Sequence, residues 1–184
     1  MCIRDSVYRK DDGAIVHCEA SVKFFLHHPR AGVSHFPGPN ATDNYERKMS
    51  RLFDRQLPLS QQHWPGVDLR YAFVKGMVFW RDGVELLDPP PERMPEQPLA
   101  GRWLRASDVD SLREHRSSLA AVAHKPHWLA PTLAAHAVGL GDVCDFMTRH
   151  FDGPAYLLML STFDATTGDE SERLFVVSDH WPEG

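Results

Sequence analysis

Residues 15–26 show the clearest alternation of apolar and polar positions in the chain. The even-numbered positions form an apolar face, which consists of Val16, Cys18, Ala20, Val22, Phe24 and Leu26. The odd-numbered positions are polar in their middle, with His17, Glu19, Ser21 and Lys23. Successive side chains of a strand point to opposite faces of a sheet, so this pattern predicts a long strand with two chemically different faces.

The first half of the chain predicts a strand–helix–strand arrangement. The expected elements are an extended piece (Val7–Lys10), the long strand (Ile15–Leu26), a helix (from a cap at Asn40 or Thr42 to about Gln56), a second strand (Leu69–Trp80) and a return strand (Val84–Leu87). Turn residues separate the strands, and a glycine inside a strand pattern indicates a bulge, here at Gly76.

The second half predicts helices followed by a hairpin. The expected elements are a helix (Ser107 to about Ala123), a helical stretch bent at two glycines (Pro131–Phe151) and a final hairpin (Tyr156–Phe163 with Arg173–Ser178). Residues 89–99 are rich in proline and form the expected connector between the halves. The predicted fold class is α/β, a mixed sheet flanked by helices with a C-terminal helical and β-hairpin extension.

Composition narrows the choice of function. The chain has 184 residues, 42% of them hydrophobic, which is enough for a packed core. Its net charge of −5 excludes a protein that coats nucleic acid by charge alone. We expect no membrane span, because no apolar run approaches the roughly 20 residues required. Of the three cysteines, Cys2 belongs to an N-terminal stretch that reads as foreign sequence. The other two, Cys18 and Cys144, are far apart and favour a reducing cytoplasm over a disulfide framework.

The first six residues read as foreign sequence. Met1–Ser6 back-translates to the transposase mosaic-end oligonucleotide that is used in sequencing libraries. We therefore expect residues 1–6 to derive from an adapter, natural sequence to start near Val7, and a preceding N-terminal part to be missing. The expected organisation is then a partial core over 7–88, the connector over 89–99 and a C-terminal region over 100–184.

The polar face of the long strand carries the candidate chemistry. A carboxylate and a lysine on one strand face can serve a phosphodiesterase: the carboxylate of Glu19 would hold Mg²⁺ and Lys23 would orient water or stabilise developing charge. The alternative is a half-solvated strand face, which carries glutamate and lysine routinely. The two are four positions apart, so about 13 Å lies between their Cα atoms on a regular strand.

Several segments resemble an uncharacterised bacterial domain-of-unknown-function family that is grouped with the PD-(D/E)XK, or restriction-endonuclease-like, superfamily. Residues 17–26 are similar to its HLEVAVKFYL segment. Further pieces follow in the same order: Gly38-Pro39-Asn40 with Asp43 and Lys48, Lys75-Gly76, Lys125 with Trp128, and Arg173 with Phe175-Val176-Val177. The resemblance covers roughly Val7 to Pro182.

The resemblance implies a restriction-endonuclease-like core that is incomplete here. Residues 15–26 would be its third strand, the following helix its second helix, and Leu69–Trp80 its fourth strand. Such sites use an aspartate from the second strand, which would precede Val7, and an acid and lysine from the third. The implied site residues are Glu19, as catalytic residue and Mg²⁺ ligand, and Lys23, with Lys48 and Gln56 of the helix assisting.

Other signals are weaker. The 11 histidines include His27, His28 and His35 on one loop, but no HExxH is present, and we expect surface or helix-terminal histidines. Cys144 lies among apolar residues and reads as a buried small hydrophobe rather than a nucleophile.

Basic residues surround the candidate site, which permits contact with DNA: Lys23, Arg30, Arg47, Lys48, Arg51 and Arg55. Two functions remain open, a Mg²⁺-dependent phosphodiester hydrolase that is inactive in this truncated form, and a non-catalytic module on the same fold that binds nucleic acid or protein.

Overall fold

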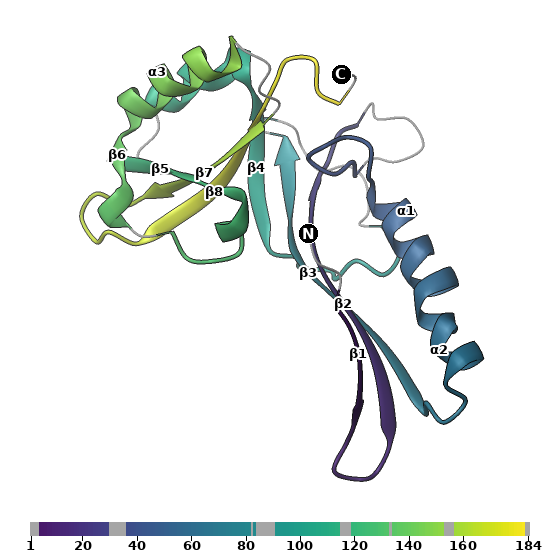
Figure 1. Ribbon diagram of the computed structural model, residues 1–184. Coiled ribbons are helices and arrows are strands. Elements are labelled where there is room, and N and C mark those ends of the chain that lie inside the picture. Colours follow the sequence, from purple (N-terminus) through teal and green to yellow (C-terminus); the bar gives the residue numbers. More distant parts are fainter. Residues whose placement is uncertain are drawn as a thin grey trace.

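The computed structural model describes residues 4–29, 36–81, 83, 91–114, 119–132, 134–152 and 157–182. Within these residues eight strands form one mixed sheet in the order β1-β2-β3-β4-β8-β7-β5-β6 (Figure 1). The strands are β1 (Arg4–Arg9), β2 (Ile15–Leu26), β3 (Leu69–Arg81), β4 (Ala100–Arg105), β5 (Leu119–Ala123), β6 (Val138–Gly139), β7 (Leu157–Phe163) and β8 (Glu170–Val177). The predicted α/β class with a mixed sheet is confirmed.

The long strand and its neighbours agree with their sequence patterns. β2 has the predicted bounds and pairs antiparallel with β1. It also pairs directly with β3, in parallel, and the helix connects the two strands in sequence. The predicted bulge at Gly76 is wrong, because β2 and β3 stay in one register through the Lys23–Gly76 pair. Close approach of the β2 backbone explains why position 76 is a glycine, because an added Cβ would lie 1.6 Å from the carbonyl oxygen of Lys23. The predicted return strand over 84–87 lies outside the described residues.

One continuous helix crosses from β2 to β3. It comprises α1 (Tyr45–Ser50), a π-helical segment η1 (Arg51–Gln56) and α2 (Leu57–His63). The side chain of Asn44, and not Asn40 or Thr42, caps it by accepting a hydrogen bond from the Arg47 amide. The predicted end at Gln56 is also wrong, since the helix continues through Pro58 to His63.

The second half departs further from the prediction. Strand β4 had no counterpart in the predicted elements. The expected helix over 107–123 is instead a 3₁₀ helix, η2 (Ala106–Glu114), followed by strand β5. The short 3₁₀ helix η3 (Lys125–His127) comes next. The expected bent helix over Pro131–Phe151 is instead the 3₁₀ helix η4 (Ala134–His136), strand β6 and helix α3 (Leu140–Phe151). The final hairpin is confirmed as the antiparallel pair β7–β8.

The strand register places all three α-helices on one face of the sheet. Phe25 and Val78 lie side by side and pack on α1, in a cluster with Tyr45 and Met49. Farther along the same face, Leu104 and Val176 pack against η2 and α3. We call this the helical face, and we call the opposite side the open face.

Loops cover the middle of the open face. Phe24, Phe79, Trp103 and Phe175 form an aromatic core there, which is closed by Trp128 and Trp181 from segments outside the sheet. The ends of β1, β2 and β3 extend beyond this core as an arm, with the helix beside it (Figure 1). None of the described helices is both long and apolar enough to cross a lipid bilayer.

Candidate functional site

The polar residues of β2 lie on the helical face, under the helix. His17, Glu19 and Ser21 are 1%, 4% and 6% exposed, so the helix removes them almost completely from solvent. They occupy alternate positions of the strand, and Lys23 continues the same row two residues beyond Ser21. The predicted acid therefore faces a helix rather than an open concavity.

Glu19 has close neighbours on both of its oxygens. Gln56 of η1 donates a hydrogen bond from Nε2 to Oε2 at 3.2 Å. The imidazole Nε2 of His17 lies 3.7 Å from Oε1. The structure thus brings Glu19 and Gln56 together, and it adds His17, which the sequence analysis did not include in the site.

Lys48 projects from α1 into the same layer. Its side chain is 3% exposed, and its Nζ has no hydrogen-bond partner among the described residues. Burial, and next the neighbouring positive charge of Lys23, lower the pKa of the Lys48 amine, while Glu19 and Asp43 oppose this shift. Lys48 therefore interacts electrostatically with both Glu19 and Lys23, the two predicted site residues of β2.

Lys23 forms an ion pair with Asp43, the residue before the helix cap. The lysine is 18% exposed and the aspartate 27%, so this pair reaches solvent, whereas Glu19 does not. Sequence reasoning placed Asp43 in a family motif but gave it no role in the site. Its position just before the cap Asn44 was the available signal, because a residue there lies beside the first turn of the helix.

A cleft of about 480 Å³ lies beside β2 at Lys23 and Phe24, and we call it the edge cleft. Within the described residues, β1 pairs with β2 from Ile15 to Ala20, so the cleft lies beyond this pairing. Its polar lining consists of Lys23, Asn40, Asp43, His124 and Lys125, and its apolar lining includes Phe24, Trp128 and Met159.

The edge cleft collects residues from distant parts of the sequence. β2 supplies Lys23, the loop before the helix supplies Asn40, and η3 supplies Lys125. The Lys125 amine lies 5.8 Å from the centre of the Trp128 ring, which combines a cation with an aromatic wall. Three motif segments that are far apart along the chain therefore meet in one solvent-accessible hollow.

Arg173 of β8 fixes the segment that carries this wall. Its guanidinium donates to the carbonyl oxygens of Trp128 and Ala130 and pairs with Glu170 at 2.6 Å. Burial alone would raise the pKa of the Glu170 carboxyl, but hydrogen bonds from Arg173 and Ser161 lower it. The arginine thus ties β8 to the loop beside the edge cleft.

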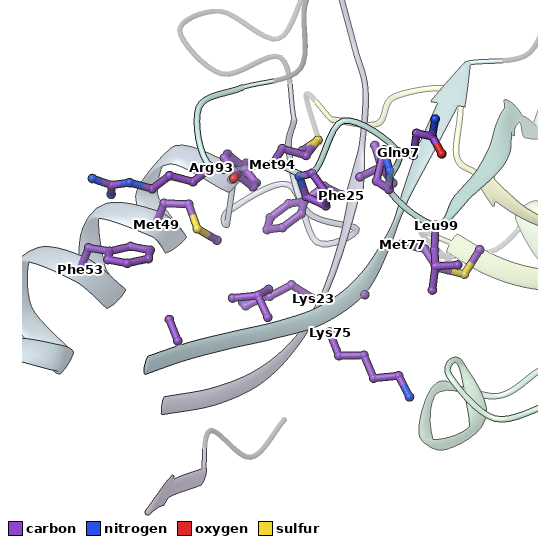
Figure 2. Close-up of a pocket in the computed structure, with 17 residues that line it drawn as sticks. Lys23, Phe25, Met49, Phe53, Lys75, Met77, Arg93, Met94, Gln97 and Leu99 are labelled. Carbon is purple, nitrogen blue, oxygen red and sulfur yellow. The ribbon is translucent and has the colours of Figure 1, made fainter. Parts of the chain in front are cut away.

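Lys23 also borders a second hollow on the helical face, of about 470 Å³, between the helix, β3 and residues 91–99 (Figure 2). Figure 2 shows Met49, Phe53 and Met94 around it, while Lys75 points away from it. The Tyr45 hydroxyl donates to the carbonyl oxygen of Glu92, which anchors residues 91–99 over the helix. This hollow is mainly apolar and holds little of the polar row.

The histidine prediction is wrong for three residues. His17, His27 and His28 are each less than 5% exposed, and the rings of His27 and His28 pack on Trp80 and Trp103. His35 and Arg30 lie outside the described residues. Among the residues that are described, no three His, Cys, Asp or Glu side chains are grouped so that they could hold a metal ion.

Cys144 is fully buried in the apolar cluster under α3, and burial raises the pKa of its thiol. This agrees with the predicted small hydrophobe.

The chain matches a protein family over residues 4–177, nearly its whole length, and that family is described as a domain of unknown function, DUF1853. No curated protein and no solved structure gives a significant match.

Proposed function

We propose that this chain, which belongs to the DUF1853 family, binds nucleic acid through the edge cleft. The observation that carries the proposal is the meeting of Lys23, Lys125 and Asn40, from three separate segments, beside the Trp128 ring. Cations and amides are the groups that contact phosphate and sugar, and an aromatic ring offers a surface for a base.

The charge balance of the cleft favours an anionic ligand. Its lining contains one carboxylate, Asp43, which is neutralised by Lys23. Lys125 and His124 are exposed and have no acidic partner in the lining. Neutralisation of phosphates by a cation such as Lys125 releases counterions, which drives nucleic-acid binding even by a protein with a negative net charge.

The order of elements supports a restriction-endonuclease-like core as the origin of the site. β1 and β2 are antiparallel, a helix follows, and β3 returns parallel to β2. In the proposed correspondence these are the second and third strands, the second helix and the fourth strand of that core. A nucleic-acid ligand is consistent with this kinship.

The described residues do not fit a Mg²⁺ ion at Glu19. Mg²⁺ retains several water ligands and is usually bound by carboxylates together with substrate phosphates. The Glu19 carboxylate is 4% exposed, accepts a hydrogen bond from Gln56 and lies beside His17. This environment favours the non-catalytic module of the two functions considered, and phosphodiester hydrolysis stays a prediction.

Fluorescence anisotropy with labelled DNA tests the binding proposal. We expect Lys125→Ala to weaken binding about threefold to tenfold near 0.1 M salt and to reduce the salt-dependence slope by about 1, as for loss of one phosphate contact. Arg113→Gln is the matched control, because Arg113 is an exposed cation paired with Asp110 and Asp145 near α3. Equal effects of both variants, or no binding by the wild type at 50 mM salt, would contradict the proposal.

The same protein tests hydrolysis. Labelled DNA is incubated with Mg²⁺ or Mn²⁺ and with wild type, Glu19→Gln or Lys23→Ala. Cleavage by the wild type that both substitutions abolish would support the hydrolase. Cleavage that persists in both variants would remove Glu19 and Lys23 from the active site. A wild type that does not cleave would agree with the inactive form expected from the sequence. Neither result affects the binding proposal.

A further inference from the structure

Aromatic side chains of the arm are exposed on the open face. On the helical face the polar row of His17, Glu19 and Ser21 is almost completely buried. On the open face Val16 is buried, but Tyr8, Tyr71 and Phe73 are 46%, 43% and 57% exposed. The three α-helices lie on the other side, and the segments that close the aromatic core contact the sheet farther along, at Phe24 and Phe79.

The exposed rings lie together on one surface. Tyr71 and Phe73 occupy alternate positions of β3 and their ring centres are 6.3 Å apart. The register places Phe73 beside Ala20 and Tyr71 beside Cys18, so small side chains of β2 leave the rings accessible. We call this surface, formed by Tyr8, Cys18, Ala20, Tyr71 and Phe73, the aromatic platform.

The strand positions around the aromatic platform carry a lysine and no described acid. Lys75 continues the row of Tyr71 and Phe73 and is exposed. Lys10 lies at the other end, where it forms an ion pair with Asp12 at 3.1 Å and also interacts electrostatically with Tyr71 and Tyr8. No described strand position on the open face of β1, β2 or β3 carries aspartate or glutamate. Exposed rings that lead to a lysine are complementary to an anionic ligand with flat apolar groups.

The aromatic platform leads into the edge cleft. Phe24, which lines the cleft, pairs with Met77, and one step along the same face Val22 pairs with Lys75. The next step reaches Phe73. Each step spans about 6.6 Å along a strand, so a chain-like ligand can contact the rings and the cleft at the same time.

We propose that the aromatic platform binds single-stranded nucleic acid, with bases stacked on Tyr71 and Phe73 and the backbone continuing toward Lys75 and the edge cleft. This inference rests on the nucleic-acid binding proposed above and specifies its ligand. Bases in a duplex already stack on one another and expose only their edges, whereas unpaired bases offer their faces to aromatic side chains. The ligand is therefore a single strand rather than a duplex.

The test compares two labelled probes of equal length, oligothymidylate and an abasic phosphodiester oligomer, by anisotropy at one salt concentration. Both probes carry the same backbone charge, so their affinity ratio isolates the contribution of the bases. We expect the wild type to prefer oligothymidylate at least about tenfold, the effect of one or two stacked bases. We expect Tyr71→Leu with Phe73→Leu to bring the ratio close to one while affinity for the abasic probe is unchanged.

Phe146→Leu is the matched control, because Phe146 is an aromatic residue of α3 that is 42% exposed and remote from the arm. Circular dichroism and thermal unfolding establish that each variant is folded. A ratio near one in the wild type, with measurable affinity for both probes, overturns the aromatic platform but leaves the edge-cleft proposal standing. Failure to bind either probe overturns both.

Two other occupants give different results. If the aromatic platform joins two copies of this chain, sedimentation shows that the wild type is a dimer and that the double leucine variant is a monomer. If a protein segment covers the face, oligothymidylate binds without dependence on Tyr71 and Phe73, so the ratio persists in the variant. Either result overturns the proposal.

Discussion

At the scale of single residues, the amine of Lys48 is the least compensated group in the polar layer between β2 and the helix. It is buried, and no group in the described part of the chain forms a hydrogen bond with its Nζ. Burial, and next the Lys23 ammonium, lower its pKa. A buried donor without a partner costs about 1–3 kcal/mol. The residue therefore reduces stability where it stands, and its nearby carboxylates only partly offset that cost.

We predict that Lys48→Met raises the free energy of unfolding by about 1 kcal/mol at neutral pH, because methionine fills similar volume without a charge. Urea unfolding measures this change. Glu46→Met is a control on the same helix, since Glu46 is exposed, and we expect it to change stability by less than about 0.5 kcal/mol. A clear loss of stability in Lys48→Met would show that the amine is better compensated than its contacts indicate.

The same residue predicts a pH dependence. The folded pKa of Lys48 is lowered below 10.5, so the unfolded chain binds the proton more readily. Its destabilising contribution is complete below the folded pKa and disappears as pH rises toward 10.5. Raised pKa values of Tyr45 and Cys144 act in the opposite direction. We therefore expect the difference between Lys48→Met and wild type, in which those two contributions cancel, to shrink as pH rises above neutral.

The residues of the candidate site were only partly accessible to sequence reasoning. Alternation placed Glu19 and Lys23 on one face, and helical spacing placed Lys48 and Gln56 on the element that covers them. The pattern could not tell which face of β2 the helix would cover, because either face could be reached from the loop that precedes it. Asp43 and Lys125 depended on loop paths, which have no periodicity to read.

At the scale of elements, Pro58 explains why the helix was predicted too short. Proline lacks an amide hydrogen and disrupts the usual bonding of a helix interior. The π-helical segment η1 precedes it, and the Leu57 amide donates to Leu52, five residues back. This wider turn accommodates the proline, so the helix continues to His63.

Strand β5 was predicted as helix, and its composition explains why. Its sequence, Leu119-Ala120-Ala121-Val122-Ala123, is rich in alanine, which favours helices in isolation. Its backbone instead pairs with β7 along its whole length and with β6 at its start. Pairing partners that are distant in sequence overrode the local preference, and no local pattern reports them.

At this scale we predict that Arg173→Met weakens both stability and DNA binding. It removes hydrogen bonds to the Trp128 and Ala130 carbonyls and leaves Glu170 without its cation. We expect the free energy of unfolding to fall by about 2–4 kcal/mol and affinity for DNA to fall with it.

The Glu170 carboxyl adds a pH signature to this prediction. Its lowered pKa stabilises the wild type above the ordinary value of 4.5, and that contribution is lost as pH falls through the folded pKa. The variant should therefore lose less stability than wild type on acidification. A variant with wild-type affinity would mean that the wall of the edge cleft holds its position without Arg173.

At the scale of the whole molecule, the central strands should be the most stable part. Every residue of β8 from Leu174 to Val177 is fully buried, as are Met159 and Leu160 of β7. Described residues of β1 are exposed, and β1 has a neighbour on one side only. We predict that hydrogen exchange is slowest in β7 and β8 and fastest in β1. Equal protection of β1 and β8 would mean that the arm unfolds only with the whole domain.

The overall arrangement was predictable as a class but not as a topology. Alternation and turn signals gave β2, β3 and the β7–β8 hairpin, because each is long and strongly patterned. The six-residue β4 carries two arginines and a glycine, so its apolar pattern is weak. Without β4, nothing in the sequence indicates that the two halves share one sheet.

The placement of β8 has a consequence for folding on the ribosome. It follows every other described strand in sequence, yet it lies between β4 and β7 and joins the halves of the sheet. Until residues 170–177 have emerged, β4 and β7 both present unpaired backbone to the surroundings. Exposed strand edges recruit other chains, so a nascent polypeptide that stalls shortly before this segment should be far more prone to aggregate than one that stalls just after it.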